Sequence, residues 1–109
     1  MTRKALLLVH TNAVSPEREA EFNTWYEQVH IPQLLERIPG IVRASRFAAS
    51  PSGPPTEQRY LALYEIEAED PASVLGAIGE AAAAGKLDMS SAMEGRPPVM
   101  ALYEPTQNA

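Results

Sequence analysis

Tyr26 and His30 are the residues of this sequence best suited to chemistry. A histidine gains and loses its proton near neutral pH, and it is the side chain most often used as a general acid or base. Tyr26 lies four residues before it, so in a helix the phenol and the imidazole cover adjacent patches of one face. The pair predicts enolisation or aldol chemistry, with His30 transferring the proton and Tyr26 donating a hydrogen bond to the substrate oxygen. The alternative is an imidazole that only caps a helix by bonding its last carbonyl groups.

The helix that carries this pair is predicted over residues 16–30. The serine–proline pair at residues 15–16 is a typical helix start, and Pro32 disfavours helical dihedrals in the residue before it, so the helix should end or kink there. His30 would then lie at the C-terminal end, where the helix dipole raises the pKa of an imidazole. Glu27, three residues earlier, could orient the ring or raise that pKa further.

His10 is the second histidine, at the end of an apolar strand predicted over residues 5–9. The helix between the two histidines spans ~15 residues, which at ~1.5 Å per residue holds them ~22 Å apart. They therefore cannot share a site within one subunit, and only scattered carboxylates remain to complete a metal centre around either. We expect no metal and no cofactor. For His10 we favour a hydrogen bond to loop backbone over a role at a site.

Four strands and two helices are predicted from the hydrophobic patterns. They cover residues 5–9, 16–30 (helix), 41–47, 60–66, 72–84 (helix) and 99–103. With right-handed crossovers this order predicts a ferredoxin-like βαββαβ domain of the α+β class. Its antiparallel sheet has the strand order 4-1-3-2, with both helices on one face. Three strands are apolar on both faces, so the uncovered face should pack against a second copy of the chain in a homodimer.

The strand directions assign neighbours to each histidine. The residues expected near His30 are Ile41, Tyr64 and Tyr103. The residues expected near His10 are Tyr60, Met89 and Met93. These six residues, together with His10, are the candidate substrate-binding residues. For the two methionines, a pocket wall or lid and ordinary core packing both remain open.

Arg43 and Arg46 lie three residues apart on the second strand, so they point to opposite faces of the sheet. One of them could bind a carboxylate or an enolate. Charged side chains also protect the edge of a sheet from pairing with another chain. We favour this edge interpretation for both arginines.

The composition excludes several classes of protein. Nine basic and 14 acidic residues give a net charge of −5, which disfavours nucleic-acid binding and docking on anionic membranes. There is no cysteine, so disulfides, thiolate nucleophiles and sulfur-ligated metals are excluded. The longest apolar run, residues 5–9, is far too short to span a membrane. We therefore expect one cytoplasmic domain over residues 1–109 that acts on a small molecule.

The stretch Phe-Asn-Thr-Trp-Tyr-Glu-Gln-Val-His-Ile-Pro at residues 22–32, with Pro39-Gly40 and an Arg-Phe strand end after it, resembles the EthD-like branch of the dimeric α/β barrel superfamily. The matching order of elements extends the resemblance over nearly the whole chain. It implies a ferredoxin-like subunit and a dimeric barrel. Similar folds host polyketide cyclases, lactone isomerases, cofactor-free monooxygenases and haem-degrading enzymes, so the fold does not decide the reaction.

The function expected from these observations is cofactor-independent acid/base catalysis. The substrate would be a small, largely apolar molecule that carries a carbonyl group, and a cyclase, an isomerase or a lyase would each fit. The enzymatic alternative is a cofactor-free monooxygenase of the same fold, in which the substrate anion meets dioxygen directly. The alternative from another class is a binding or carrier protein without turnover.

Overall fold

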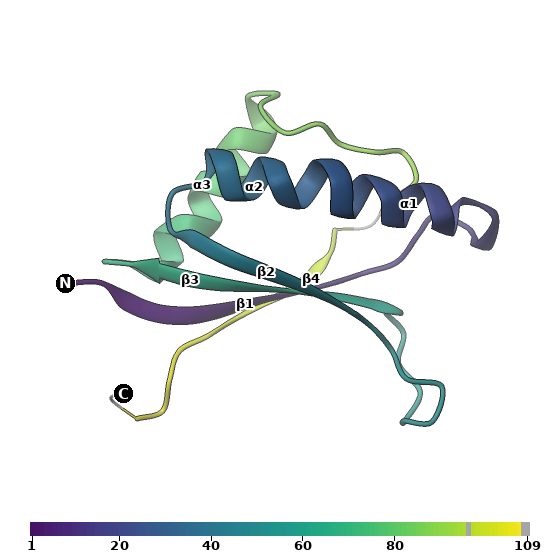
Figure 1. The fold of residues 1–109 in the computed structure, drawn as a ribbon, viewed down its shortest axis with the longest axis horizontal. Helices are drawn as coiled ribbons and strands as arrows, with labels where there is room; N and C mark the ends of the chain where they lie inside the picture. The colour runs from purple at the N-terminus through teal and green to yellow at the C-terminus, as the bar shows by residue number, and fades with distance from the viewer. Residues whose placement is uncertain (96, 108–109) are drawn as a thin grey trace.

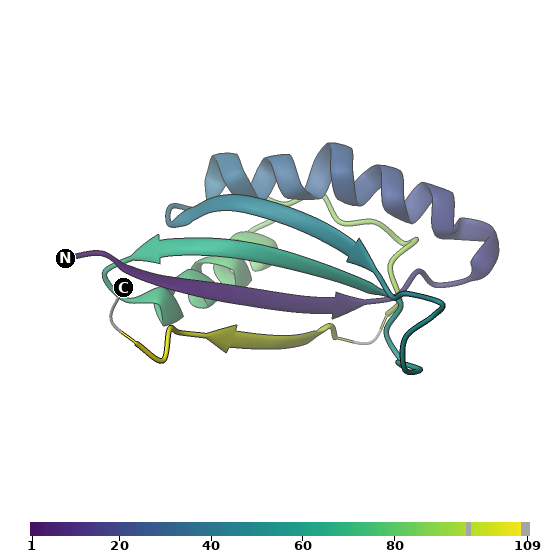
Figure 2. The same ribbon diagram turned by 60° about the horizontal axis from the view of Figure 1, so that its bottom comes forward.

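The computed structural model of the chain describes residues 1–95 and 97–107. Its four strands are β1 (Arg3–Thr11), β2 (Ile41–Ala48), β3 (Tyr60–Ala68) and β4 (Val99–Tyr103). They form one sheet in the order β2-β3-β1-β4, and every neighbouring pair is antiparallel (Figure 2). Read from the other edge, this is the predicted order 4-1-3-2. The predicted α+β fold class and sheet topology are therefore confirmed.

A single helical layer covers one face of this sheet (Figure 1). It consists of the short 3-10 turn η1 (Pro16–Arg18), then α1 (Glu19–Trp25), the π-helical turn η2 (Tyr26–His30), α2 (Ile31–Arg37) and, after β3, α3 (Pro71–Ala83). The start of α3 is capped by Asp70, whose side chain accepts a hydrogen bond from the backbone N–H of Ala72. The helical layer carries both candidate catalytic residues, Tyr26 and His30.

The first helix does not end before Pro32, so of the two expected outcomes a helix end is wrong, and an irregular turn is found just before the proline. Helical turns continue from Glu19 to Arg37. In the π-helical turn the N–H of Ile31 bonds the carbonyl of Tyr26, five residues back instead of four. This wider turn gives the proline ring room that a regular α-helix would lack, because the ring clashes with the carbonyl four residues earlier. His30 therefore lies in the middle of a long helix.

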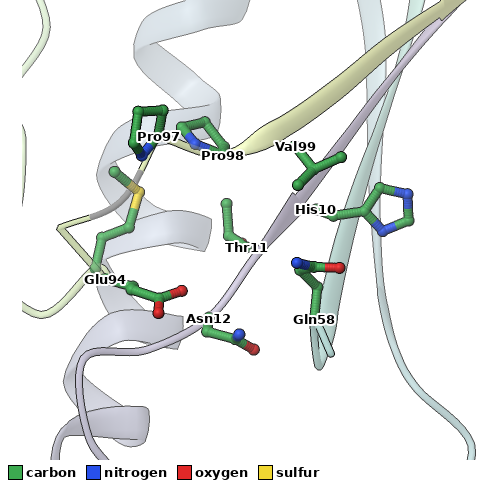
Figure 3. Close-up of a pocket in the computed structure, with 9 residues that line it drawn as sticks. His10, Thr11, Asn12, Gln58, Glu94, Pro97, Pro98 and Val99 are labelled. Atoms are coloured by element: carbon green, nitrogen blue, oxygen red, sulfur yellow. The ribbon is translucent and has the colours of Figure 1, made fainter. Parts of the chain in front are cut away.

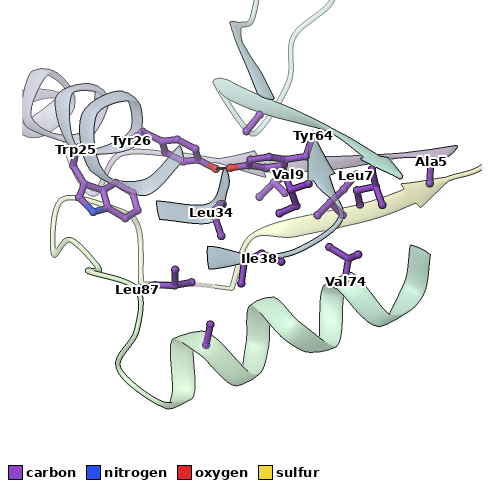
Figure 4. Close-up of a cluster of buried hydrophobic side chains, with 14 of the residues drawn as sticks. Ala5, Leu7, Val9, Trp25, Tyr26, Leu34, Ile38, Tyr64, Val74 and Leu87 are labelled. Atoms are coloured by element: carbon purple, nitrogen blue, oxygen red, sulfur yellow. Dashed lines mark hydrogen bonds between the residues drawn. The ribbon is translucent and has the colours of Figure 1, made fainter. Parts of the chain in front are cut away.

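The hydrophobic core lies between the helical layer and the sheet (Figure 4). Alternate residues of β1 point into it, and Leu7 at the centre of the strand is fully buried. Phe22 from α1 and Ile66 from β3 are equally inaccessible. The positions between them point to the opposite face, which no helix of the described chain covers (Figure 1). Apolar residues at these outward positions include Leu6, Leu8, Leu61, Leu63, Val99 and Tyr103.

The turn from α2 into β2 depends on a glycine. Gly40 has a φ of 102°, which side-chain-bearing residues rarely adopt. A Cβ atom placed there would also lie 2.9 Å from Cγ2 of Val74 on α3. The Pro39-Gly40 pair noted in the sequence thus allows the helix to turn tightly onto the sheet.

Candidate functional site

A cavity of about 130 Å³ lies between the sheet and the helical layer, beside Tyr26 and His30. The sheet contributes Leu7, Val9, Thr11, Tyr64 and Met100 to its wall. The helices contribute Tyr26, His30, Leu34, Ile78 and Ala82. The α3–β4 connection (residues 84–95 and 97–98 of the described chain) contributes Leu87, Met89, Met93 and Pro98. Apart from the imidazole of His30, none of these described lining residues is acidic or basic, so the cavity suits a largely apolar, uncharged ligand.

Two phenols meet at this cavity. Tyr26 and Tyr64 are each only 1% exposed, and the Tyr64 hydroxyl donates to the Tyr26 hydroxyl oxygen at 3.4 Å (Figure 4). Burial raises the pKa of Tyr26, against the opposing effects of the Tyr64 hydrogen bond and the Arg46 charge. Burial and the adjacent Tyr26 phenol raise the pKa of Tyr64. Both groups therefore keep their protons at neutral pH, and the Tyr26 proton is available to another acceptor.

His30 is held between aromatic rings. Its imidazole stacks on the Trp25 indole, with centroids 4.6 Å apart, and meets the Tyr26 ring edge-on at 5.0 Å. Its Nδ1 is buried and has no hydrogen-bond partner among the described residues. Burial, with a smaller contribution from the Arg46 charge, lowers the pKa of His30 to about 4. The imidazole is therefore neutral at pH 7.

This result corrects the expectation that His30 would favour its charged form. The expectation assumed that the helix ends at His30, where the negative end of the dipole would raise the pKa of the ring. The helix instead continues to Arg37, so the imidazole lies far from that end. The side chain points into the protein, and loss of hydration decides the sign of the change.

Arg46 is not the surface residue expected of a sheet edge, so the edge interpretation is wrong for it. Its side chain is only 10% exposed, and its guanidinium carbon lies 4.4 Å from the centroid of the Tyr26 ring. Nη1 donates to Glu27 at 2.9 Å and to Asn23 at 3.0 Å. Glu27 therefore binds this arginine and not the imidazole as expected. Arg43 does match the edge interpretation, because it is exposed on the edge strand beside Glu65.

The α3–β4 connection brings both methionines to the cavity of His30. Met89 and Met93 were expected beside His10, and only Met93 also lines the hollow there. The connection crosses back over the first helix, where the Trp25 indole N–H donates to the Asp88 carbonyl at 2.7 Å. Gln33 holds the same aspartate, with its side-chain amide donating to the Asp88 carboxylate at 2.7 Å. These hydrogen bonds fix the start of the connection, next to Met89, against the first helix.

The remaining candidate residues lie outside the described lining of this cavity. Ile41 is buried in the core opposite Ile66, and Tyr103 is 55% exposed on the last strand, so neither belongs to the surroundings of His30 as expected. The Tyr60 hydroxyl donates to Glu19 at 3.0 Å. His10 lines a separate hollow of about 80 Å³ at the end of β1 (Figure 3).

Thr11 is the polar lining residue that sequence reasoning missed, alongside several apolar ones. It is 5% exposed, and within the described chain its hydroxyl oxygen has no hydrogen-bond partner. A signal was present in the sequence. Thr11 follows Leu7 and Val9 at two-residue spacing, so it is a polar residue at an inward position of a buried strand.

The described residues contain no cluster of three or more histidine, cysteine, aspartate or glutamate side chains that could hold a metal ion. Among the same residues, no helix combines the length and the apolar character needed to cross a bilayer. The polar side chains that line the cavity can offer hydrogen bonds from the phenols and proton transfer at the imidazole.

Comparison with solved structures supports the fold over the full chain. A "putative monooxygenase" from Shewanella loihica PV-4 is 16% identical with a TM-score of 0.62, and the match covers 99% of each chain. An EthD-like protein from Ralstonia eutropha JMP134 is 12% identical with a TM-score of 0.60, over 100% of this chain and 97% of the other.

A third similar structure is an ethyl tert-butyl ether D (EthD) family protein from Bacillus halodurans C-125. It is 24% identical with a TM-score of 0.58, over 95% of this chain and 99% of the other. No family model and no curated protein matches the sequence. The fold that the resemblance of residues 22–32 implies is thus confirmed, and the chain shares the ferredoxin-like α+β fold of these EthD-like structures.

Proposed function

We propose that the chain is a cofactor-independent acid/base enzyme that acts on a small, largely apolar, carbonyl-bearing molecule as a cyclase, an isomerase or a lyase. One observation carries the proposal: a neutral imidazole and a pair of protonated phenols share one apolar cavity. A buried acid/base group beside a fixed hydrogen-bond donor is the arrangement that enolisation requires.

The phenol pair provides the oxyanion site. The substrate carbonyl accepts a hydrogen bond from the Tyr26 hydroxyl, and the Tyr64 hydroxyl strengthens this donor by donating in turn to the Tyr26 oxygen. The guanidinium of Arg46 lies against the same ring and favours negative charge nearby. Together these groups stabilise the enolate more than the ketone, which lowers the barrier to its formation.

His30 moves the proton. With a pKa of about 4 the imidazole is ready to accept a proton throughout the neutral range. Because it is a weak base, it suits a proton that is already acidic, such as one between a carbonyl and a second electron-withdrawing group. Once protonated, it is a strong acid that returns the proton to another carbon or to a leaving group. Isomerisation and elimination both follow from these two steps.

A cofactor-free monooxygenase is the second candidate, favoured by the fold shared with the Shewanella loihica protein. The same groups would form the substrate anion, and dioxygen would then react with it in the apolar cavity. The two functions differ in a measurable way, because only the monooxygenase consumes oxygen in proportion to the substrate.

The test is exchange of the α-proton of a 2-alkyl β-keto ester in D₂O, followed by proton NMR, since exchange detects enolisation whatever the final product. We expect His30→Gln to slow catalysed exchange ~10²- to 10⁴-fold, and Tyr26→Phe ~10²- to 10³-fold. Tyr103→Phe is the matched control, because this tyrosine is exposed and lies outside the described lining of the cavity. Wild-type exchange rates in both cavity variants would overturn the proposal. A ligand that binds and leaves with no catalysed exchange would indicate a carrier protein.

A further inference from the structure

Two polar atoms at the cavity are buried without a partner. They are Nδ1 of His30, on the helical layer, and Oγ1 of Thr11, on the sheet. Neither atom bonds any residue that the structure describes, and the walls around them are mostly apolar. A buried polar group without a hydrogen bond is costly, so such atoms at a binding cavity indicate groups that a ligand satisfies.

The phenol pair and the Thr11 hydroxyl belong to different parts of the cavity. Tyr64, which carries one phenol of the oxyanion site, lies opposite Leu7 in the sheet register. Thr11 lies four residues further along β1, a distance of roughly 13 Å between backbone positions. Thr11 also lines the hollow around His10, so it marks the cavity's end near the exit of β1 (Figure 3). A ligand that satisfies both ends must carry two separated polar groups.

The size of the cavity limits what lies between these groups. An apolar cavity of about 150 Å³ holds one benzene molecule. At about 130 Å³ this cavity has room for one six-membered ring, and the flexible Met89 and Met93 side chains in its wall can adapt to substituents. A fused polycyclic ligand would not fit without larger rearrangement.

The charge of the cavity limits the second polar group. The described lining residues include no lysine, arginine, aspartate or glutamate. A carboxylate or phosphate at the Thr11 end would be buried without a counter-charge, which is strongly unfavourable. A neutral hydroxyl can instead exchange a hydrogen bond with the threonine hydroxyl, which both donates and accepts.

We propose that the cavity takes a neutral monocyclic molecule with a carbonyl oxygen at the Tyr26 end and a hydroxyl group, across the ring, that hydrogen-bonds Thr11. The carbonyl end of this assignment rests on the proposed function. The Thr11 end rests only on the unpartnered hydroxyl, the volume of the cavity and its lack of charge.

The test compares two ligands of nearly equal shape, 4-hydroxybenzaldehyde and 4-methylbenzaldehyde, by calorimetric titration at pH 6, where the phenol of the hydroxy compound is neutral. Thr11→Val removes the hydroxyl and keeps the size of the side chain. We expect this change to weaken binding of the hydroxy compound about 5- to 10-fold, the loss of one hydrogen bond. Binding of the methyl compound should stay the same or become tighter.

Tyr26→Phe separates this inference from the proposed function, because it should weaken both aldehydes. If Tyr26→Phe does so and Thr11→Val affects neither ligand, or both equally, the Thr11 assignment is overturned and the carbonyl site stands. If Tyr26→Phe changes neither affinity, the carbonyl site itself is overturned. The thermal midpoint of the unliganded Thr11→Val protein should be at least that of the wild type, because the change removes an unpartnered polar atom. A lower midpoint would show that the hydroxyl is structural and would overturn its role in ligand binding.

Discussion

The low pKa of His30 predicts a pH dependence of stability that needs no substrate to measure. The ring is neutral in the folded protein down to about pH 4, whereas the unfolded chain binds a proton near pH 6.5. Between these values the unfolded state holds more protons, so the free energy of unfolding falls as the pH is lowered. The contribution of the neutral His30 ring to the free energy of unfolding is complete above about pH 6.5 and is lost as the pH approaches 4.

The magnitude follows from the difference between the two pKa values. At about 1.4 kcal/mol per pH unit, a pKa of about 4 against the ordinary 6.5 corresponds to roughly 3 kcal/mol. This is a large part of the stability expected for a domain of this size. The assay is urea unfolding at pH 7, 6, 5 and 4. In the His30→Gln variant, most of the fall in the free energy of unfolding between pH 7 and pH 5 should disappear, because few carboxylates titrate in this range.

The pKa itself can be measured by NMR titration of the ring protons. His10→Gln leaves one imidazole, which assigns the signal to His30. Arg46→Met should raise the pKa only part of the way to 6.5, because burial is the larger cause and the charge of Arg46 the smaller. A wild-type pKa at or above 6.5 would refute the reasoning, and so would a free energy of unfolding that is unchanged between pH 7 and pH 5.

Three further changes test other parts of the structure. The open face of the sheet should hold two copies of the chain together in a dimer. Leu63→Asp at the centre of this face should therefore convert the dimer to a monomer, as measured by light scattering. A wild-type protein that is monomeric at micromolar concentration would contradict this. Trp25→Phe should lower the free energy of unfolding in urea by about 1 kcal/mol, because the hydrogen bond from the indole to the Asp88 carbonyl is lost. It should also speed amide exchange around Asp88. Unchanged exchange there would argue against this anchoring. Gly40→Ala should cost about 1–3 kcal/mol, because of the positive φ and the contact with Val74; a fully stable variant would show that the turn tolerates a side chain.

Much of the fold could be predicted because its signals are local. The Asp70-Pro71 pair starts a helix, and alternating or continuous apolar runs mark the strands. Once the order of elements is known, chain connectivity and crossover handedness leave few topologies. The helix end considered at Pro32 does not occur, because the rule behind it concerns a regular α-helix. A single π-helical turn accommodates the proline, and the local hydrophobic pattern does not predict such a turn.

The candidate site was predicted only in part. Tyr26 and His30 lie together because four-residue spacing in a helix requires it, and contact between their rings follows. The surroundings of the pair come from distant segments, such as Arg46 on β2 and the α3–β4 connection with its two methionines. Their positions depend on how side chains pack between layers, and short-range patterns do not contain that information.

The sequence by itself determined the type and order of the elements and the adjacency of the phenol and the imidazole, since these depend on residues a few positions apart. Tertiary structure alone decided the protonation state of His30. The helix dipole considered in the sequence acts only near a helix end, whereas the loss of water around a buried ring depends on everything packed against it. For the same reason only the folded chain shows that Thr11 is buried at the cavity without a partner.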